Sequence, residues 1–378
     1  MRTIRRWLCR GCILLLALSV AGAGFLALAP QGRAVVKTAL FISQVVPAVP
    51  SQTWFQPAPV RERIQVPTPE GPREADLYRP PGAGPYAATV FFLGVAPAGP
   101  DDARVVGLGN ALARAGMVTL MYWSPEMLER RIHPPDIQNL VAAFQFLQAQ
   151  PMVDEVRVGM GGLCVGASFV LMAAAQEEVR DDVVFVNAFG PYFRLDDLAR
   201  AIGTRTRFSG DERTEWAPGN LTRDVTIKLL LGSLVSEPEA AQVEQALAQG
   251  EGLSPAGLSP EAYAVYRVLT GGTVAEVESA IAALPADLLA KMAEVSPARY
   301  VDAIRAPVLV MHDRDDDAVP PEESRRLAAA LGDQRVERYT EFSLFQHVTP
   351  TRPVGIIELG RELNKLFWHM YGIMRQTT

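Results

Sequence analysis

The sequence is poor in the residue types that mark nucleic-acid-binding and metal-binding proteins. Its 378 residues include 3 cysteines and 4 histidines, and the formal net charge is −6. Nucleic-acid-binding domains usually carry a clustered basic surface, but the one dense basic run here is Arg2, Arg5, Arg6 and Arg10. No metal-ligand or cofactor motif stands out. We therefore expect no nucleic-acid partner, no metal and no cofactor.

The few cysteines also argue against a disulfide framework. Cys9 and Cys12 form a C-x-x-C pair, but it has neither a second ligand pair nor an adjacent strand–helix–strand pattern. We interpret them as two small apolar residues that enter a membrane. Cys164 is then the only thiol in the rest of the chain, so a structural disulfide is not expected there.

An apolar stretch from Gly11 to Ala29 follows the basic run, and no charge interrupts it. About 20 such residues span the hydrocarbon core of a bilayer as a helix, and the arginines hold the N-terminus in the cytoplasm. Residues 1–32 are predicted to be an uncleaved anchor. A cleavable signal peptide is the alternative, because Ala21-Gly22-Ala23 and Ala27-Leu28-Ala29 are both small-residue cleavage sites. The remainder is expected on the extracytoplasmic side, either membrane-anchored or, after cleavage, secreted or periplasmic.

The rest of the chain divides into four parts. Residues 33–60 begin apolar and then contain four prolines, which predicts an interfacial helix and a stiff linker. Residues 61–193 and 306–378 alternate strand-like and helix-like segments, which is typical of a mostly parallel sheet with helices on both faces. Residues 194–305 have helical periodicity and few strand signals. We predict a helical cap inserted between two consecutive strands, the first of them near Val183–Val186.

The turn Gly162-Leu163-Cys164-Val165-Gly166 lies between a strand-like run and an Ala-rich helical run. It has the form of a nucleophile elbow, with cysteine where serine is usual. Side chains at the two glycines would collide with the neighbouring strand and helix. Cys164 is therefore predicted to be a nucleophile, and the N-terminus of the following helix favours its thiolate. Ser168 is the rival nucleophile, but nothing frames it as an elbow, and a polar role in the first helical turn is simpler.

A thiol nucleophile needs a base, and in α/β-hydrolases the triad follows the chain order nucleophile, acid, histidine. His133 precedes the elbow, and His312 lies in or at the end of the strand before the acid. His369 lies within an apolar C-terminal helix, where a core or interfacial role is expected. His347 lies in a loop before that helix and is predicted to be the base.

The acid is expected after the strand Val308–Met311, where Asp313, Asp315, Asp316 and Asp317 lie close together. Asp316, in the run Asp-Asp-Ala-Val-Pro, is our first choice and Asp315 the second. The acid would orient the imidazole and stabilise the imidazolium.

An oxyanion hole needs two backbone N–H groups. One is expected from Val165, the residue after the nucleophile. The other is expected from Val95 or Ala96, in the loop after the third strand. Gly94 in that loop allows close approach of the backbone.

With these residues in place, the chain resembles the dienelactone hydrolase family of the α/β-hydrolase superfamily, over roughly residues 60–193 and 306–370. That family has a G-x-C-x-G-G elbow and a Cys-Asp-His triad, which the resemblance carries to Cys164, Asp316 and His347. The segments 94–102 and 345–348 also look like those of membrane-associated bacterial α/β-hydrolases. The chain departs from the family at Ala167, where a second glycine is usual, and in its long cap.

The sequence thus predicts a hydrolase of an ester, thioester or lactone that works through an acyl-cysteine intermediate. The substrate would be a small-molecule or lipid-like acyl compound, and transfer to another acceptor is possible on the same machinery. The alternative is a catalytically inactive, membrane-anchored binding or scaffold protein that keeps the fold, because a Cys-for-Ser change can accompany loss of activity. A transporter or receptor would need more membrane segments than one.

Overall fold

The computed structural model describes residues 24–47, 57–96 and 98–378. Most of the predicted anchor, and with it Cys9 and Cys12, therefore lies outside the described residues. Residues 24–28, at the end of the predicted anchor, are helical. Across the described ranges, no helix is both long and apolar enough to cross a membrane.

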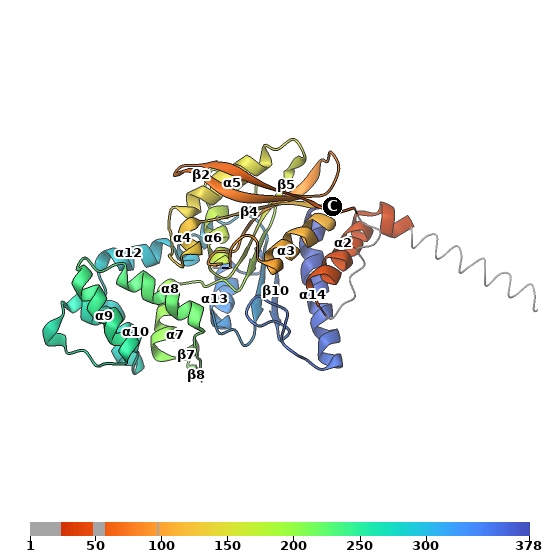
Figure 1. Cartoon of the computed structure of the whole chain (residues 1–378). Helices are drawn as coiled ribbons and strands as arrows, with labels where there is room; N and C mark the ends of the chain where they lie inside the picture. The colour runs from red at the N-terminus through yellow and green to blue at the C-terminus, as the bar shows by residue number, and fades with distance from the viewer. Residues whose placement is uncertain (1–23, 48–56, 97) are drawn as a thin grey trace, which may run out of the picture.

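An eight-stranded sheet forms the centre of the molecule (Figure 1). Its order is β1-β2-β4-β3-β5-β6-β9-β10, with β1 and β2 antiparallel to their neighbours and the other strands parallel. The prediction of a mostly parallel sheet is confirmed. The strands are β1 (Val60–Thr68), β2 (Gly71–Arg79), β3 (Tyr86–Phe92), β4 (Met117–Tyr122), β5 (Val153–Leu163), β6 (Val186–Phe189), β9 (Val308–Asp313) and β10 (Val336–Phe342).

Helices cover both faces of this sheet, and two apolar clusters fill the space between the layers. Strands β4 and β9 are buried along their whole length, as expected for parallel strands that are covered on both sides. One face carries α5 (Asp136–Gln148), α6 (Val165–Ala174) and α13 (Pro321–Leu331). The other carries α2 (Pro30–Val45), α3 (Ala103–Arg114) and α14 (Ile356–Gln376).

Helix α2 packs against α3 and α14, side by side with them in Figure 1. Its buried side includes Ala34, Phe41 and Ile42, whereas Val36 is exposed. Residues 33–60 are predicted to be an interfacial helix and linker, with the hydrolase body beginning at residue 61. The apolar side of α2 packs in the same buried cluster as residues of α3 and α14.

The insertion between β6 and β9 contains six α-helices, three short 3₁₀ helices and one short hairpin. The helices are α7 (Leu195–Thr204), α8 (Asn220–Leu231), α9 (Glu237–Gln249), α10 (Pro260–Thr270), α11 (Val274–Ala282) and α12 (Ala286–Glu294). The hairpin pairs β7 (Thr206–Ser209) with β8 (Glu212–Glu215). A four-residue helix, α4 (Pro125–Leu128), follows β4. We refer to residues 194–305 as the cap.

Candidate active site

Cys164 lies between the last residue of β5 and the first residue of α6, at a sharp turn of the backbone. Its φ is 53° and its ψ is −128°, a conformation that non-glycine residues rarely adopt. The Cys164 N–H donates to the carbonyl of Phe189, at the end of β6, over 2.8 Å. Strain of this kind persists only where the surrounding structure holds it, and it is typical of active sites.

The glycines that flank the elbow sit where no side chain fits. A Cβ at Gly162 would lie 2.6 Å from the carbonyl oxygen of Gly166, and a Cβ at Gly166 would lie 2.2 Å from that of Phe92. A Cβ at Gly94 would lie 2.4 Å from the amide nitrogen of Gly166. The collisions predicted from the sequence are confirmed. The loop after β3 therefore touches the first turn of α6 through backbone alone.

Asp316 and His347 form a hydrogen-bonded pair at the same edge of the sheet. The His347 Nδ1–H donates to Asp316 Oδ2 over 2.7 Å. The other carboxylate oxygen, Oδ1, accepts the backbone N–H groups of Ala318 (2.7 Å) and Val319 (3.0 Å). Burial by itself raises the pKa of Asp316, but the charge of His347 and these hydrogen bonds hold that pKa below its usual value. Asp316 is therefore an ionised acceptor that fixes the imidazole.

Cys164 faces the same imidazole. Burial by itself lowers the pKa of His347, but the charge of Cys164, the charge of Asp316 and hydrogen bonds to both raise that pKa well above its usual value. With Nδ1 engaged by Asp316, Nε2 is left for the thiol. The structure thus brings the three predicted residues together, with His347 between Cys164 and Asp316.

The other aspartates of the acid loop have different partners. Asp313 is buried, pairs with Arg352 over 2.8 Å and accepts the backbone N–H of His347 over 3.0 Å. Asp315 is exposed and pairs with Arg352 over 3.2 Å. Asp315, the second choice for the acid, thus points away from the imidazole.

No known protein-family model matches the chain. The bile acid-CoA:amino acid N-acyltransferase of Mus musculus is 29% identical over 156 residues, which are 41% of this chain and 35% of that protein. The chain thus aligns with about a third of the length of that relative.

Among solved structures, 2,6-dihydroxy-pseudo-oxynicotine hydrolase has a TM-score of 0.50 and 15% identity, over 84% of this chain and 68% of that one. The acylaminoacyl peptidase of Pyrococcus horikoshii has a TM-score of 0.48 and 14% identity, over 82% and 41%. The α/β hydrolase GrgF of Penicillium sp. sh18 has a TM-score of 0.47 and 18% identity, over 82% and 99%. At these identities the likeness concerns the fold alone. The chain has the α/β-hydrolase fold.

In this α/β-hydrolase fold, the remaining predicted positions fall as follows. Val165 and Val95 are buried and Ala96 is partly buried, on the two segments that meet at Gly94 and Gly166. The first amides of a helix have no partner within the helix, so the Val165 N–H has none within α6. Their role as oxyanion donors stays a prediction.

Residues that the sequence analysis set aside have other partners. Ser168 is buried, and its hydroxyl donates to the carbonyl of Tyr192 over 2.9 Å. His133 Nε2 lies 2.8 Å from Glu70 Oε2. His369 is buried between Thr340 and Asn187 at 3.0 Å from each, and burial lowers its pKa to about 3. A buried, neutral role for His369 agrees with the predicted core position.

Two positions near the triad were missed. His312 lies beneath the acid, with Nδ1 2.6 Å from Ser324 Oγ and Nε2–H donating to the Val319 carbonyl over 2.9 Å. It thereby supports the loop that holds Asp316. Gly190 follows β6 with a φ of 66° and lies beside the His347–Asp316 pair. No pattern in the sequence marked Gly190, because the predicted strand ended at Val186, four residues earlier.

The cap is tied to three consecutive residues of the acid loop. Trp216 Nε1–H donates to the carbonyl of Asp316 over 2.7 Å. The N–H of Gly219 donates to the carbonyl of Asp317 over 2.7 Å, and the Thr222 hydroxyl donates to that of Ala318 over 3.0 Å. The cap therefore meets the site at the backbone of the acid.

No group of three or more His, Cys, Asp or Glu side chains within the described ranges is placed to hold a metal ion.

Proposed function

We propose that the protein is an acyl-transfer enzyme of the hydrolase type, which cleaves an ester, thioester or lactone through an acyl-Cys164 intermediate. The observation that carries this is the 2.7 Å hydrogen bond between His347 and Asp316, together with the raised pKa that Cys164 gives His347. When an imidazole lies between a thiol and a carboxylate, it can take the proton of the thiol and so activate it as a nucleophile. The predicted likeness to dienelactone hydrolases rests on the same cysteine and extends to this chemistry, not to the substrate.

In the proposed reaction, the Cys164 thiolate attacks the substrate carbonyl and forms a carbon–sulfur bond, while the proton from the thiol resides on His347. The backbone N–H groups of Val165 and of Val95 or Ala96 stabilise the oxyanion. The leaving group departs with the proton from His347. Water then attacks the thioester, His347 accepts the water proton, and the acid product and the free thiol are released.

Transfer to an amine or alcohol is the second candidate for the final step. It is favoured by the 29% identity to an enzyme whose name describes acyl transfer from a CoA thioester to an amino acid. In that version the acceptor replaces water, and His347 takes the acceptor's proton. The two versions differ only in which nucleophile enters the cap-covered edge of the site.

Mass spectrometry of Cys164 tests the proposal. We expect an activated acyl ester or thioester to add one acyl group to the wild type, with a burst of leaving group equal to the enzyme concentration. Cys164→Ala should show neither, whereas Ser168→Ala should show both. Adding glycine in excess to the aqueous reaction then distinguishes the two final steps: transfer gives the amide, and hydrolysis gives the free acid.

An inactive scaffold is the competing explanation. It would leave Cys164 unmodified by every acyl probe at neutral pH while the protein stays folded. Full turnover by Cys164→Ala would equally defeat the proposed nucleophile.

The membrane placement stays part of the proposal: residues 1–32 anchor the chain or act as a cleaved signal, and the remainder functions outside the cytoplasm on a small-molecule or lipid-like acyl substrate, without nucleic acid. Support comes from the apolar run behind four arginines. N-terminal sequencing of the mature protein distinguishes the anchor from the signal peptide, and alkaline extraction of membranes tests the anchor.

A further inference from the structure

The loop between β3 and α3 carries the second predicted oxyanion donor, and contacts hold it at both ends. It begins at Gly94, which has a φ of 64° and meets the first turn of α6 through backbone alone. It ends at Asp102, whose side chain caps α3 by accepting the N–H of Arg104 over 2.8 Å. Val95 and Ala96 directly follow Gly94. The position of their N–H groups therefore depends on how the rest of the loop is held.

Two consecutive turns connect the oxyanion segment to the far end of the loop. The N–H of Gly99 donates to the carbonyl of Ala96 over 2.9 Å, and the N–H of Asp102 donates to the carbonyl of Gly99 over 3.3 Å. Pro100 lies between these hydrogen bonds, and its ring fixes its own φ. A shift of Pro100 is therefore passed on to Ala96 through few free torsions.

Arg61, the second residue of β1, binds this far end. Its Nη2 donates to the carbonyl of Pro100 and to Asp101 Oδ1, each over 2.9 Å. The same guanidinium holds the Asp76 carboxylate in a fork, with Nε 3.2 Å from Oδ1 and Nη2 3.0 Å from Oδ2. Asp101 is 74% exposed, so solvent screens its ion pair. The carbonyl of Pro100 is thus the contact through which Arg61 holds the loop.

Asp76 is a fixed point at the catalytic edge of the sheet. It is fully buried and lies in register with Met121, the residue before the last of β4. Besides Arg61, it accepts from Arg63 Nε over 3.2 Å and from Trp123 Nε1 over 3.0 Å. A buried carboxylate needs such partners, and together they hold it in one place. Arg61 therefore attaches the loop to a rigid part of the sheet.

We propose that Arg61 is a positioning residue for the acylation of Cys164, because it fixes the loop that presents the N–H of Val95 or Ala96 to the oxyanion. The proposal rests on the proposed function, since an oxyanion forms only when Cys164 attacks a carbonyl. Arg61 acts through the backbone of Pro100 and does not itself contact the substrate. It speeds acylation and leaves the reactivity of the thiol unchanged.

The test compares two reactions of the same thiol. Acylation by an activated thioester forms an oxyanion, whereas alkylation by iodoacetamide forms a sulfur–carbon bond, releases iodide and forms no oxyanion. Arg61→Ala should slow acylation at least about tenfold, because small displacements of reacting groups are costly. It should change the alkylation rate less than about twofold, since that rate follows the thiolate alone. Release of the leaving group and mass spectrometry of Cys164 measure the two rates.

Arg79→Ala is the matched control. Arg79 lies on β2, and its side chain is 25% exposed, against 26% for Arg61. It pairs with Glu62 over 2.8 Å instead of with the loop. Its loss removes an ion pair of the same hairpin, so both rates should stay within about twofold of the wild type.

An unchanged acylation rate in Arg61→Ala overturns the proposal, and so do equal losses of acylation and alkylation, which would mean that Arg61 supports the whole site. If Arg61→Ala does not fold, Arg61→Lys takes its place, because it keeps a charge beside Asp76 and loses the fork. It should slow acylation at least about threefold with alkylation unchanged, and equal acylation rates overturn the proposal. If iodoacetamide modifies wild-type Cys164 but no acyl probe does, the proposed function itself fails, and the role of Arg61 fails with it.

Discussion

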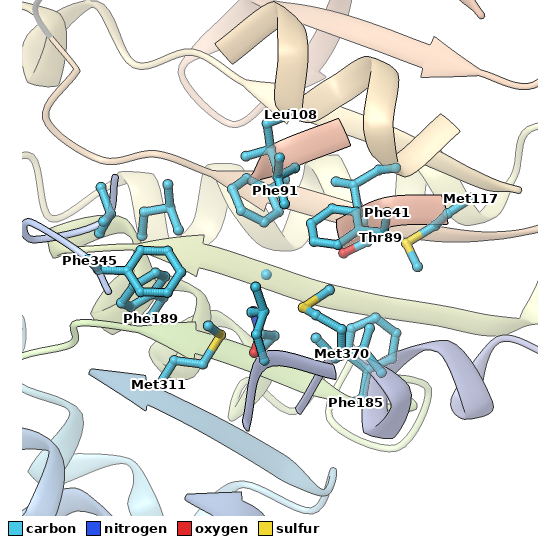
Figure 2. A pocket seen from close by; sticks show the side chains of 18 residues that line it. Phe41, Thr89, Phe91, Leu108, Met117, Phe185, Phe189, Met311, Phe345 and Met370 are labelled. Atoms are coloured by element: carbon cyan, nitrogen blue, oxygen red, sulfur yellow. The ribbon is translucent and has the colours of Figure 1, made fainter. Parts of the chain in front are cut away.

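The two faces of the central sheet are filled in different ways. On the face of α5, α6 and α13, every residue of α6 is buried, and glycine backbones meet without side chains between them. On the face of α2, α3 and α14, aromatic and methionine side chains leave a cavity of about 110 Å³. Both faces reach the same catalytic edge. The first holds the turn at Cys164 by backbone contact, and the second leaves unfilled volume in the core (Figure 2).

The largest expected effect comes from Asp316 and Asp315, whose binding partners lead to helices on opposite faces of the sheet. Asp316 is bound by the backbone that leads into α13, whereas Asp315 pairs with Arg352 ahead of α14. Asp316→Asn should lower kcat about 10⁴-fold, because the amide fixes the wrong imidazole tautomer. Asp315→Asn should change kcat less than about fivefold, since an exposed ion pair contributes at most about 1 kcal/mol. Steady-state kinetics decide, and equal losses would contradict the assignment of the acid.

The glycine contact on the α6 face gives the next largest effect. Gly166→Ala places a Cβ against the Phe92 carbonyl and must displace either the elbow or the loop after β3. We expect acylation of Cys164 to slow at least about a hundredfold, as for other small misplacements of reacting groups. Gly360→Ala, on α14 with open space around it, is the control. It should keep the wild-type rate and raise the free energy of unfolding by up to about 1 kcal/mol. A wild-type acylation rate in Gly166→Ala would show that the contact is not needed.

The same substitution on each face compares their packing directly. Leu140 on α5 is fully buried in the filled face, and Leu112 on α3 lines the cavity. Leu140→Ala should cost about 4 kcal/mol of unfolding free energy and Leu112→Ala about 2 kcal/mol, because a side chain beside a void loses fewer contacts. Leu140→Phe should lower the unfolding free energy by about 1–3 kcal/mol, because it overpacks a filled site. Leu112→Phe should lower it by less than about 2 kcal/mol, the value expected for Leu112→Ala. Urea unfolding measures all four, and equal costs on the two faces would remove the contrast.

The smallest effect is a pH dependence at the shared edge. The raised pKa of His347 means that its contribution to stability is complete below its usual pKa of 6.5 and is lost as the pH rises through the higher folded value. The difference in unfolding free energy between the wild type and His347→Gln should therefore shrink from neutral to alkaline pH. It should shrink less in a Cys164→Ala background, because the thiolate charge is part of the cause. A difference in unfolding free energy that grows with pH would contradict the raised pKa of His347.

Much of this site could be predicted from the sequence because its parts are local. Gly162, Cys164 and Gly166 lie within one pentapeptide, and a strand and a helix of clear pattern flank it. His347 followed by elimination among four histidines. The strand before the cap was placed at Val183–Val186 but is found at Val186–Phe189. Val183 and Phe185 are as buried as the strand itself, so apolar character does not mark where pairing begins.

What could not be predicted depends on contacts between distant segments. The hairpin of β7 and β8 has exposed, polar strands and therefore no apolar alternation. An apolar helix at Pro30–Val45 fits a membrane surface as well as a groove, and only the presence of α3 and α14 decides between them. The cavity is lined by side chains from three helices and five strands, so the pattern of no single segment predicts it.

The three hydrogen bonds from the cap to Asp316, Asp317 and Ala318 have a consequence for how a substrate enters. A cap that swings away as one body must break all three, at about 3 kcal/mol in total. The Asp316 carboxylate would keep its own hydrogen bonds to Ala318, Val319 and His347. The three cap bonds therefore favour the closed cap by about that free energy. Cap residues distant from Trp216, Gly219 and Thr222 can move without breaking any of the three.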